Sequence, residues 1–417
     1  MTTSPSVSLA PAAPRARRLS PAASFFLLAS ITVSFLAGSS APTPLYAVYQ
    51  AAWGFSPITV TVIFGIYAVA VLTTLLTFGG LSDHVGRRPV LIAAAAVQAV
   101  TMLVFASASS VSMLLVARVI QGLSTGAALG ALGAGMLDLD RARGTVANAV
   151  GPMTGTALGG VASGLMVQYL PAPTHLVYLA FFFVFVAQVV GVALMSETVT
   201  PRPGALASMR PRLRLPPVVR RPFLLAAPVL VAAWALAGFY GSLGPALVRR
   251  IVGAGAGGHA VALGGLTLFV LAGSGALTVL AMHKRAAATF MIFGATVLLV
   301  GVGLTLVAAS RAAAALFFVG AVLAGMGFGA GFQGAIRTVL PLTQPHERAG
   351  VLSVLYVVSY LAMGVPAVAA GFRVVHGGGL PRTARDYGLG VMILAALALA
   401  GALARRPPAP NASDARA

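Results

Sequence analysis

The stretch ITVTVIFGIYAVAVLTTLLTFGGLSDHVGRRPVLIAAAAVQAVTMLVF, residues 58–105, contains two long apolar runs separated by one short charged turn. A helix rises about 1.5 Å per residue, so about 20 apolar residues cross the hydrocarbon core of a bilayer, which is about 30 Å thick. The runs 58–80 and 89–105 fit this length. The stretch therefore predicts two membrane-spanning helices joined by a tight turn.

The same pattern recurs along the whole chain. Of its 417 residues, 59% are hydrophobic and only 8% are charged, and the mean hydropathy is +0.95. A soluble domain carries about a quarter of its residues as charges, so a large soluble core is excluded. The sequence predicts an all-α integral membrane protein with twelve transmembrane helices, at residues 24–45, 58–80, 89–105, 111–137, 146–169, 176–195, 223–247, 261–282, 289–309, 313–336, 351–372 and 387–403.

The longest polar break divides these runs into two sets of six. It covers residues 197–222 and is rich in arginine and proline. Two such sets predict two six-helix bundles with a solute site between them, near the middle of the membrane. The expected organisation is a cytoplasmic N-terminal tail (1–22), an N-terminal six-helix bundle (23–196), a cytoplasmic linker (197–222), a C-terminal six-helix bundle (223–404) and a cytoplasmic C-terminal tail (405–417).

The basic residues indicate the orientation. The formal net charge of +20 would suggest nucleic-acid binding in a soluble protein. Here 20 of the 27 Lys and Arg residues fall in segments on the side of the N-terminus, and six fall on the opposite side. This excess predicts a multi-pass protein of the cell (cytoplasmic) membrane with both termini in the cytoplasm and no nucleic-acid partner.

A signal peptide is the rival interpretation of the N-terminus. Arg15, Arg17 and Arg18 precede an apolar run that ends in small residues at 37–41. We reject this interpretation because no soluble domain follows, and because removal of the first span would invert the charge asymmetry of every later loop.

The remaining composition argues against metal sites and enzymatic chemistry. The chain has no cysteine, so disulfides and thiolate metal sites are excluded. All six histidines lie in predicted loops with a spacing that suits no metal, and no Ser/His/Asp constellation occurs at membrane depth. We expect no cofactor, no metal and no enzymatic activity.

The charged turn at residues 79–89 carries the most specific motif. Taken alone, it is a solvated loop that fixes topology, in which a glycine permits the tight turn. Its pattern Gly-x-x-x-Asp-x-x-Gly-Arg-Arg strongly resembles the signature of the major facilitator superfamily. The resemblance implies a cytoplasmic charge relay that locks and releases the inner gate, formed by Gly79, Asp83, Gly86, Arg87 and Arg88.

The fourth span contains the one basic residue inside a predicted helix, Arg118. The segment 114–122 resembles the second motif of the drug/proton antiporter branch of that family, which implies a role in proton coupling. A mid-membrane Arg costs about 2.5 to 3.5 kcal/mol on insertion scales, so it is seldom idle. The alternative is snorkelling, because Arg118 lies only about 10 Å from the outer end of its helix.

Arg118 lacks a predicted counter-ion, because all seven acidic residues fall at span ends or in loops. Its guanidinium must therefore bind carbonyls, hydroxyls, amides such as that of Gln121, water, or an anionic part of the solute. We assign Arg118 and Gln121 to coupling or solute binding.

Small residues recur every four positions on the fourth and fifth spans. The segment 151–160 resembles a third antiporter motif, built around Gly-Pro, although its Gly-Pro pair lies one helical repeat early. Close helix packing is an equally good interpretation of the glycine stripe. The packing set comprises Gly122, Gly126, Gly151, Pro152, Gly155, Gly159 and Gly160.

Aromatic and polar residues on the inner helices are candidates for the lining of a central cavity. The alternative for each of them is ordinary packing or anchoring at the membrane surface. The set comprises Tyr67, Trp234, Tyr240, Gln333, Tyr356, Ser359 and Tyr360.

The resemblance covers residues 20–405 and implies a secondary active transporter of a small organic solute. It further implies alternating access with proton-linked efflux, as in an antiporter, by a monomer whose partners are the solute, protons and the lipid bilayer. One alternative is a facilitator or importer of a neutral or anionic metabolite without proton coupling. Another is a membrane receptor that binds a ligand and transports nothing.

Overall fold

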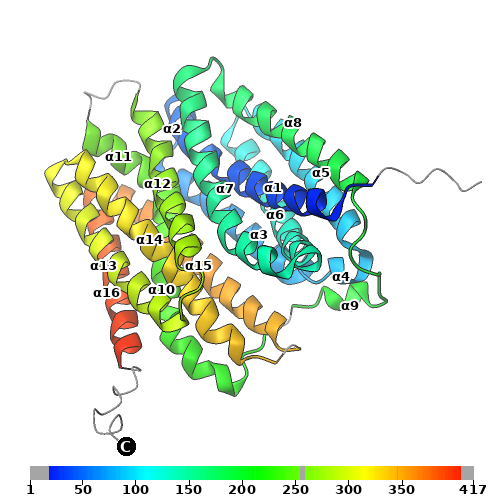
Figure 1. Cartoon of the computed structure of the whole chain (residues 1–417). Coiled ribbons are helices and arrows are strands. Elements are labelled where there is room, and N and C mark those ends of the chain that lie inside the picture. The colour runs from blue at the N-terminus through cyan, green and yellow to red at the C-terminus, as the bar shows by residue number, and fades with distance from the viewer. Residues whose placement is uncertain (1–17, 212, 254–258, 345, 405–417) are drawn as a thin grey trace, which may run out of the picture.

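The computed structural model describes residues 18–211, 213–253, 259–344 and 346–404, and every regular element in these residues is a helix (Figure 1). Twelve helical segments are long and apolar enough to cross a membrane. The predicted all-α membrane fold is confirmed. Most of the predicted N-terminal tail and the whole predicted C-terminal tail lie outside the described residues.

The first six spans form the N-terminal half of the molecule, in which α1 and α2 together make the first span. Its helices are α1 (Pro21–Ser40), α2 (Pro42–Trp53), α3 (Pro57–Phe78), the short α4 (Ser82–Val85), α5 (Arg87–Ala106), α6 (Val111–Leu139), α7 (Arg141–Tyr169) and α8 (Pro173–Leu194).

The last six spans form the C-terminal half. The short helix α9 (Ala205–Ser208) lies between the halves. The helices of the C-terminal half are α10 (Pro217–Ser242), α11 (Gly244–Val252), α12 (His259–Ala281), α13 (Ala287–Arg311), α14 (Ala314–Val339), the 3₁₀ turn η2 (Leu340–Leu342), α15 (Arg348–His376) and α16 (Gly379–Leu403).

Side-chain caps fix where several helices begin. The Ser20 Oγ accepts from the N–H of Ala23 at 3.2 Å at the start of α1, and Ser110 does the same for α6. The Asp140 carboxylate separates α6 from α7 by accepting from the N–H of Arg143 at 2.9 Å. Such caps bind the helical N–H groups that lack a partner in the first turn.

Two spans that the sequence predicted as continuous are broken near one end. The predicted run 24–45 divides at Ala41, and the predicted run 223–247 divides at Leu243. A proline lies within the first two positions after each break, in α2 and in α11. Since proline has no N–H, the carbonyl four residues before it loses its helical donor.

Two other predicted boundaries also differ from the structure. The last helix starts at Gly379, well before the predicted start at residue 387. Arg220 and Arg221, which were predicted to lie in the linker, belong to the first turns of α10. Both differences arise because a helix can continue past the apolar core into the polar surface of the membrane, where charged side chains meet water.

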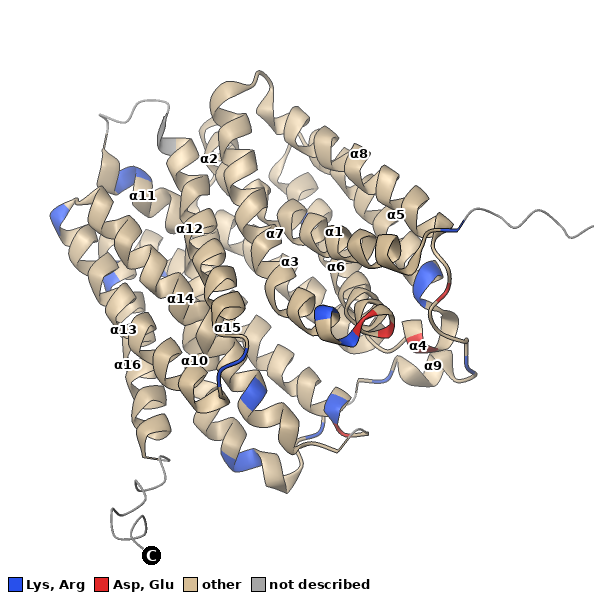
Figure 2. Ribbon diagram, in the orientation of Figure 1, with Lys and Arg blue, Asp and Glu red and all other residues tan. Residues whose placement is uncertain are grey.

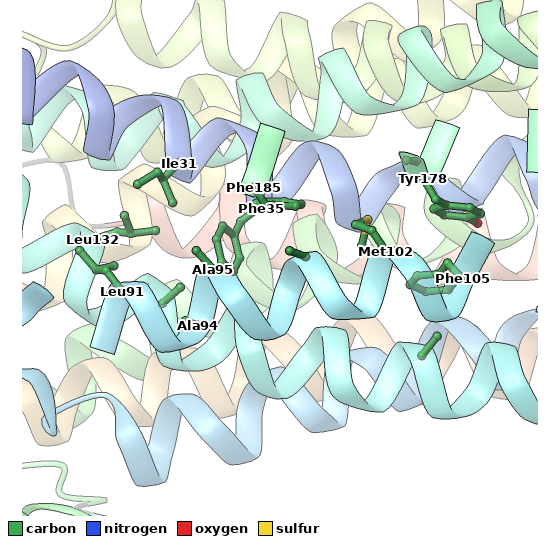
Figure 3. Packing of buried hydrophobic residues seen from close by; sticks show 14 of the residues in the cluster. Ile31, Phe35, Leu91, Ala94, Ala95, Met102, Phe105, Leu132, Tyr178 and Phe185 are labelled. Atoms are coloured by element: carbon green, nitrogen blue, oxygen red, sulfur yellow. The ribbon is translucent and has the colours of Figure 1, made fainter. Parts of the chain in front are cut away.

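Each half has its own hydrophobic core. In the N-terminal half, α5 and α8 pack beside α1 through aromatic pairs: Phe35 meets Phe185 edge to face at 5.2 Å, and Phe105 stacks on Tyr178 at 4.8 Å (Figure 3). The C-terminal half has separate clusters, one of them around Phe239, Leu298 and Phe317. Smaller clusters, such as that of Tyr67, Val71, Tyr360 and Met363, join residues of both halves.

Contacts between the halves follow α3 with α15 and α7 with α12, and several of them involve glycine. A Cβ at Gly371 would lie 2.1 Å from the Thr61 Oγ1, and one at Gly265 would lie 2.3 Å from the carbonyl oxygen of Gly160. Since no side chain fits at these positions, the Thr61 side chain packs directly on the backbone of α15, and α7 and α12 approach backbone to backbone. Below, the end of the molecule that carries α4 is the α4 end, and the opposite end, with α2 and α11, is the α11 end (Figure 1).

Candidate functional site

The turn between α3 and α5 has a backbone that requires glycine. Gly86 has φ +105°, a value that side chains strongly disfavour, and a Cβ there would lie 2.6 Å from the Glu197 Oε2. Between Phe78 and Gly86 the chain forms the single turn α4, which carries Asp83. The turn thereby brings Asp83 to within one helical turn of Arg87, at the start of α5.

The Arg87 side chain is the centre of a charged cluster. It is only 5% exposed and forms ion pairs with Asp83 and with Asp138 of α6, the latter at 3.2 Å from Nε. Its Nη1 also donates to the Ser82 Oγ at 2.7 Å. Two carboxylates thus compensate the charge of one buried guanidinium and a hydroxyl accepts another of its hydrogen bonds, which is the condition for keeping such a charge away from water.

A second carboxylate site lies on the backbone of the same turn. The Glu197 oxygens accept from the N–H of Arg87 at 2.8 Å and from the N–H of Arg88 at 3.0 Å. These are the first N–H groups of α5, and a negative charge is stabilised at a helix N-terminus. The Arg88 guanidinium binds the carbonyl of Val192 at 3.2 Å and that of Ala193.

Glu197 and Asp138 were not in the predicted relay, although both bind its arginines. The sequence shows each of them at the end of a span on the same side of the membrane as the motif. Proximity at that end was the available signal, but the partner of each arginine depends on how α5, α6 and α8 pack. Figure 2 shows acidic residues gathered at the α4 end. They also border a cavity of about 250 Å³ whose lining includes Asp138, Ser196 and Glu197.

The cluster also holds the start of the segment between the two halves. The N–H of Arg202 donates to the carbonyl oxygen of His84 at 2.9 Å, and Thr198 donates through its hydroxyl to Asp138 at 3.2 Å. The chain that leads to α10 is therefore bound to the same turn that carries Asp83.

Arg118 lies in the interior of the N-terminal half, with 1% of its surface exposed. Its Nε donates to the Tyr46 hydroxyl at 2.9 Å, and its Nη1 donates to the carbonyl of Ser39 at 2.8 Å and to the Gln121 Oε1 at 2.6 Å. The guanidinium also lies over the Tyr67 ring, 5.2 Å from the centroid. Carbonyl, hydroxyl and amide partners were predicted for Arg118. Snorkelling is excluded because these buried groups hold the side chain inside the protein.

The partners of Arg118 lie at the break in the first span. Pro42 cannot donate to the carbonyl of Gly38, and that carbonyl accepts instead from the Gln121 Nε2 at 3.1 Å. Arg118 and Gln121, one turn apart on α6, therefore hold the α1–α2 junction together.

The predicted cavity residues separate into two groups. Tyr67, Tyr356 and Tyr360 lie in one cluster between the halves, and Trp234 joins it, with its ring 5.1 Å from that of Tyr360. Tyr240 lies elsewhere, inside the C-terminal half, where it stacks on Phe317 at 6.0 Å. Gln333 on α14 and Ser359 on α15 are buried.

The polar atoms of these residues include several without a protein partner among the described residues. These atoms are the Trp234 Nε1, the Tyr240 hydroxyl and the Ser359 Oγ. An unpartnered buried polar atom is costly unless water or a ligand binds it. The aromatic cluster between the halves thus carries at least one free donor, on Trp234.

The glycines of the predicted packing set contact three neighbouring helices. Gly122 and Gly126 face α3, where a Cβ at Gly126 would lie 2.5 Å from the carbonyl oxygen of Val71. Gly151, Gly155 and Gly159 face α1, and Gly160 faces α12 in the other half. Pro152 lies inside α7. The glycine stripe on α7 therefore packs within one half, while the adjacent position packs across the interface.

Comparisons with known proteins agree with this architecture. The model of the Major Facilitator Superfamily matches residues 27–365. Among solved structures, the nucleoside transporter NupG superposes with a TM-score of 0.62 at 13% identity, covering 92% of this chain and 97% of that one. A single-site variant of NupG gives 0.66 at 12% identity, with coverage of 92% and 98%. At this identity the likeness concerns the fold. No curated protein sequence matches the chain.

Proposed function

Because the chain belongs to the Major Facilitator Superfamily, we propose that it exports a small organic solute by alternating access, with protons moving in the opposite direction. The chain is a membrane transporter of a small solute and not an enzyme. The proposal adds the mechanism, the direction and the coupling.

One observation carries the mechanism: the two halves have separate cores and meet through glycine-lined helix contacts. Alternating access requires two bundles that move as units around a site between them. At these glycine contacts the helix surfaces are smooth, which suits such movement, and elsewhere the halves meet through aromatic residues such as Tyr67 and Tyr360.

The α4 cluster supplies the gate in this proposal. Asp83, Asp138 and Glu197 fix the positions of Arg87 and Arg88 and attach the segment that leads to the C-terminal half. We assign to Gly79, Asp83, Gly86, Arg87 and Arg88 the control of opening at the cytoplasmic face, with both termini in the cytoplasm. We propose that the chain acts as a monomer.

Coupling is assigned to Arg118 with Gln121. In the described residues, Asp83, Asp138, Asp140, Glu197 and Glu347 lie at helix ends or in loops, and Asp386 lies in the first turns of α16, paired with Arg373. Proton antiport here has to use a group other than a mid-membrane carboxylate. The same observation favours a second candidate function, a facilitator or importer of a neutral or anionic metabolite without proton coupling.

The solute is to be sought among uncharged and anionic organic compounds with a flat ring. The aromatic cluster of Tyr67, Trp234, Tyr356 and Tyr360 offers faces for stacking and one free indole donor. Nucleosides belong in the first panel, since the neighbour NupG is a nucleoside transporter and nucleosides have this shape.

The test has two stages. A growth screen of an expressing strain against toxic compounds and metabolites identifies the solute, and everted vesicles then measure its flux with and without an imposed pH gradient. We expect flux that follows the gradient. Flux that is indifferent to the gradient would establish the facilitator instead, and the absence of flux for any bound ligand would indicate a receptor.

A further inference from the structure

The break in the seventh span leaves one carbonyl without a helical donor. Gly241 lies at the end of α10, and the residue four positions later is Pro245, near the start of α11. Because proline has no N–H, the carbonyl of Gly241 has no i+4 partner.

That carbonyl is bound from the other half of the molecule. The Thr43 Oγ1 donates to the Gly241 oxygen at 3.2 Å, and both residues are buried. Thr43 lies directly after Pro42, so the break in the first span provides the donor and the break in the seventh span provides the acceptor. Phe64 of α3 covers the same position, where a Cβ at Gly241 would lie 2.6 Å from the ring.

The position of Thr43 depends on the hydrogen bonds that Arg118 and Gln121 form. Arg118 and Gln121 bind the carbonyls of Ser39 and Gly38, which lie in the last turn of α1 before the break. These bonds fix the direction in which α2 leaves α1, and hence the place of Thr43 at the α11 end.

We propose that Thr43 is a positioning residue for the transport cycle, because its hydrogen bond to the Gly241 carbonyl latches the two halves together at the α11 end. The inference rests on alternating access. In the state described here the latch is closed, and the opening of the α11 end requires it to break. Removal of one neutral hydrogen bond shifts such an equilibrium roughly three- to fivefold toward the open state.

The experiment uses the absence of native cysteine. Thr61→Cys places one thiol at the α11 end, where Thr61 is 0% exposed and packs against Gly371 of the other half. The full-length protein in lipid nanodiscs is labelled with a polar maleimide. Because both faces of a nanodisc are open to the solvent, the labelling rate reports opening of the α11 end whichever way the protein is inserted. Three variants are compared in this background: Thr43→Val, Thr43→Ser and Thr32→Val.

Thr43→Val retains the shape and removes the donor, and we expect labelling of Cys at position 61 to accelerate roughly three- to fivefold. Thr43→Ser retains the hydroxyl and is expected to label at the original rate. Thr32→Val is the matched control, because the buried Thr32 hydroxyl donates to Leu28 in its own helix at 3.0 Å. An unchanged rate in Thr43→Val, or equal acceleration in either of the other two variants, would overturn the latch.

The labelling assay needs no solute, so the latch and the proposed function can fail separately. Faster labelling in Thr43→Val together with no flux of any solute would support the latch and refute the transport proposal. Demonstrated flux with unchanged labelling would do the reverse.

Discussion

Arg118 holds a positive charge in the interior of α6 with a phenol, an amide and a backbone carbonyl as partners. A buried guanidinium is tolerated when its donors are all bound, and Arg supplies five of them in a fixed fork. The sequence predicted the need for such partners and named Gln121. It did not identify Tyr46 or Ser39, because these come from α2 and α1 and only the fold brings them close.

Replacement of Arg118 by Ala should both destabilise the protein and abolish transport. The change removes the donor from three buried acceptors, on Tyr46, Ser39 and Gln121, and each buried group left without a partner costs about 1 to 3 kcal/mol. We expect a clearly lower melting temperature in detergent. Arg143→Ala is the control, because Arg143 forms an exposed pair with Asp140 at 3.5 Å and such pairs contribute at most about 1 kcal/mol. If Arg118→Ala had the melting temperature and the solute flux of the wild type, the role of Arg118 and its partners would be refuted.

Asp83→Asn should separate gating from stability. The Asp83 side chain is 56% exposed and the buried Arg87 keeps its pair with Asp138, so the loss of stability should be small. Membrane insertion should be normal, and solute flux should fall strongly, because the relay loses one of its carboxylates. Asp140→Asn retains a helix cap and serves as the control. Equal flux in the two variants would leave the α4 turn with a topological role alone.

At the scale of the helices, the apolar runs predicted all twelve spans, because burial in lipid requires an unbroken run of apolar side chains. The breaks at Ala41 and Leu243 were missed, since hydropathy continues through them. The prolines after each break were a visible signal. Their effect depends on partners for the freed carbonyls, which only packing supplies.

Helix contacts give a prediction about glycine. Gly126→Ala would place a Cβ 2.5 Å from the carbonyl oxygen of Val71, and such overpacking costs about 1 to 3 kcal/mol. We expect a lower melting temperature and a reduced yield of folded protein. Gly390→Ala is the matched control, because a Cβ there meets nothing within 4 Å and alanine favours a helix. Similar melting temperatures of the two variants would show that α3 and α6 can move apart without loss of stability.

For the whole molecule, the long polar break at residues 197–222 and the two sets of six spans predicted the two-half layout. The cluster at the α4 end was predictable only as a local motif, because its remaining carboxylates, Asp138 and Glu197, come from the end of α6 and from the segment after α8. The cavity residues were predictable as a class, while the separate place of Tyr240, which stacks on Phe317 inside the C-terminal half, was not.

The central claim is that the two halves move against each other, and distances between spin labels test it directly. Exposed cysteine pairs can be placed across the halves at the α11 end (Tyr169 with Ser310) and at the α4 end (Arg141 with Lys284), with Tyr169 and Ser107 as a pair within one half. Measurements in nanodiscs compare acidic and alkaline pH and the Thr43→Val variant. The account predicts that the two cross-half distances change in opposite directions while the control stays fixed. If the distance of each of the three pairs stayed the same under every condition, the account would be contradicted.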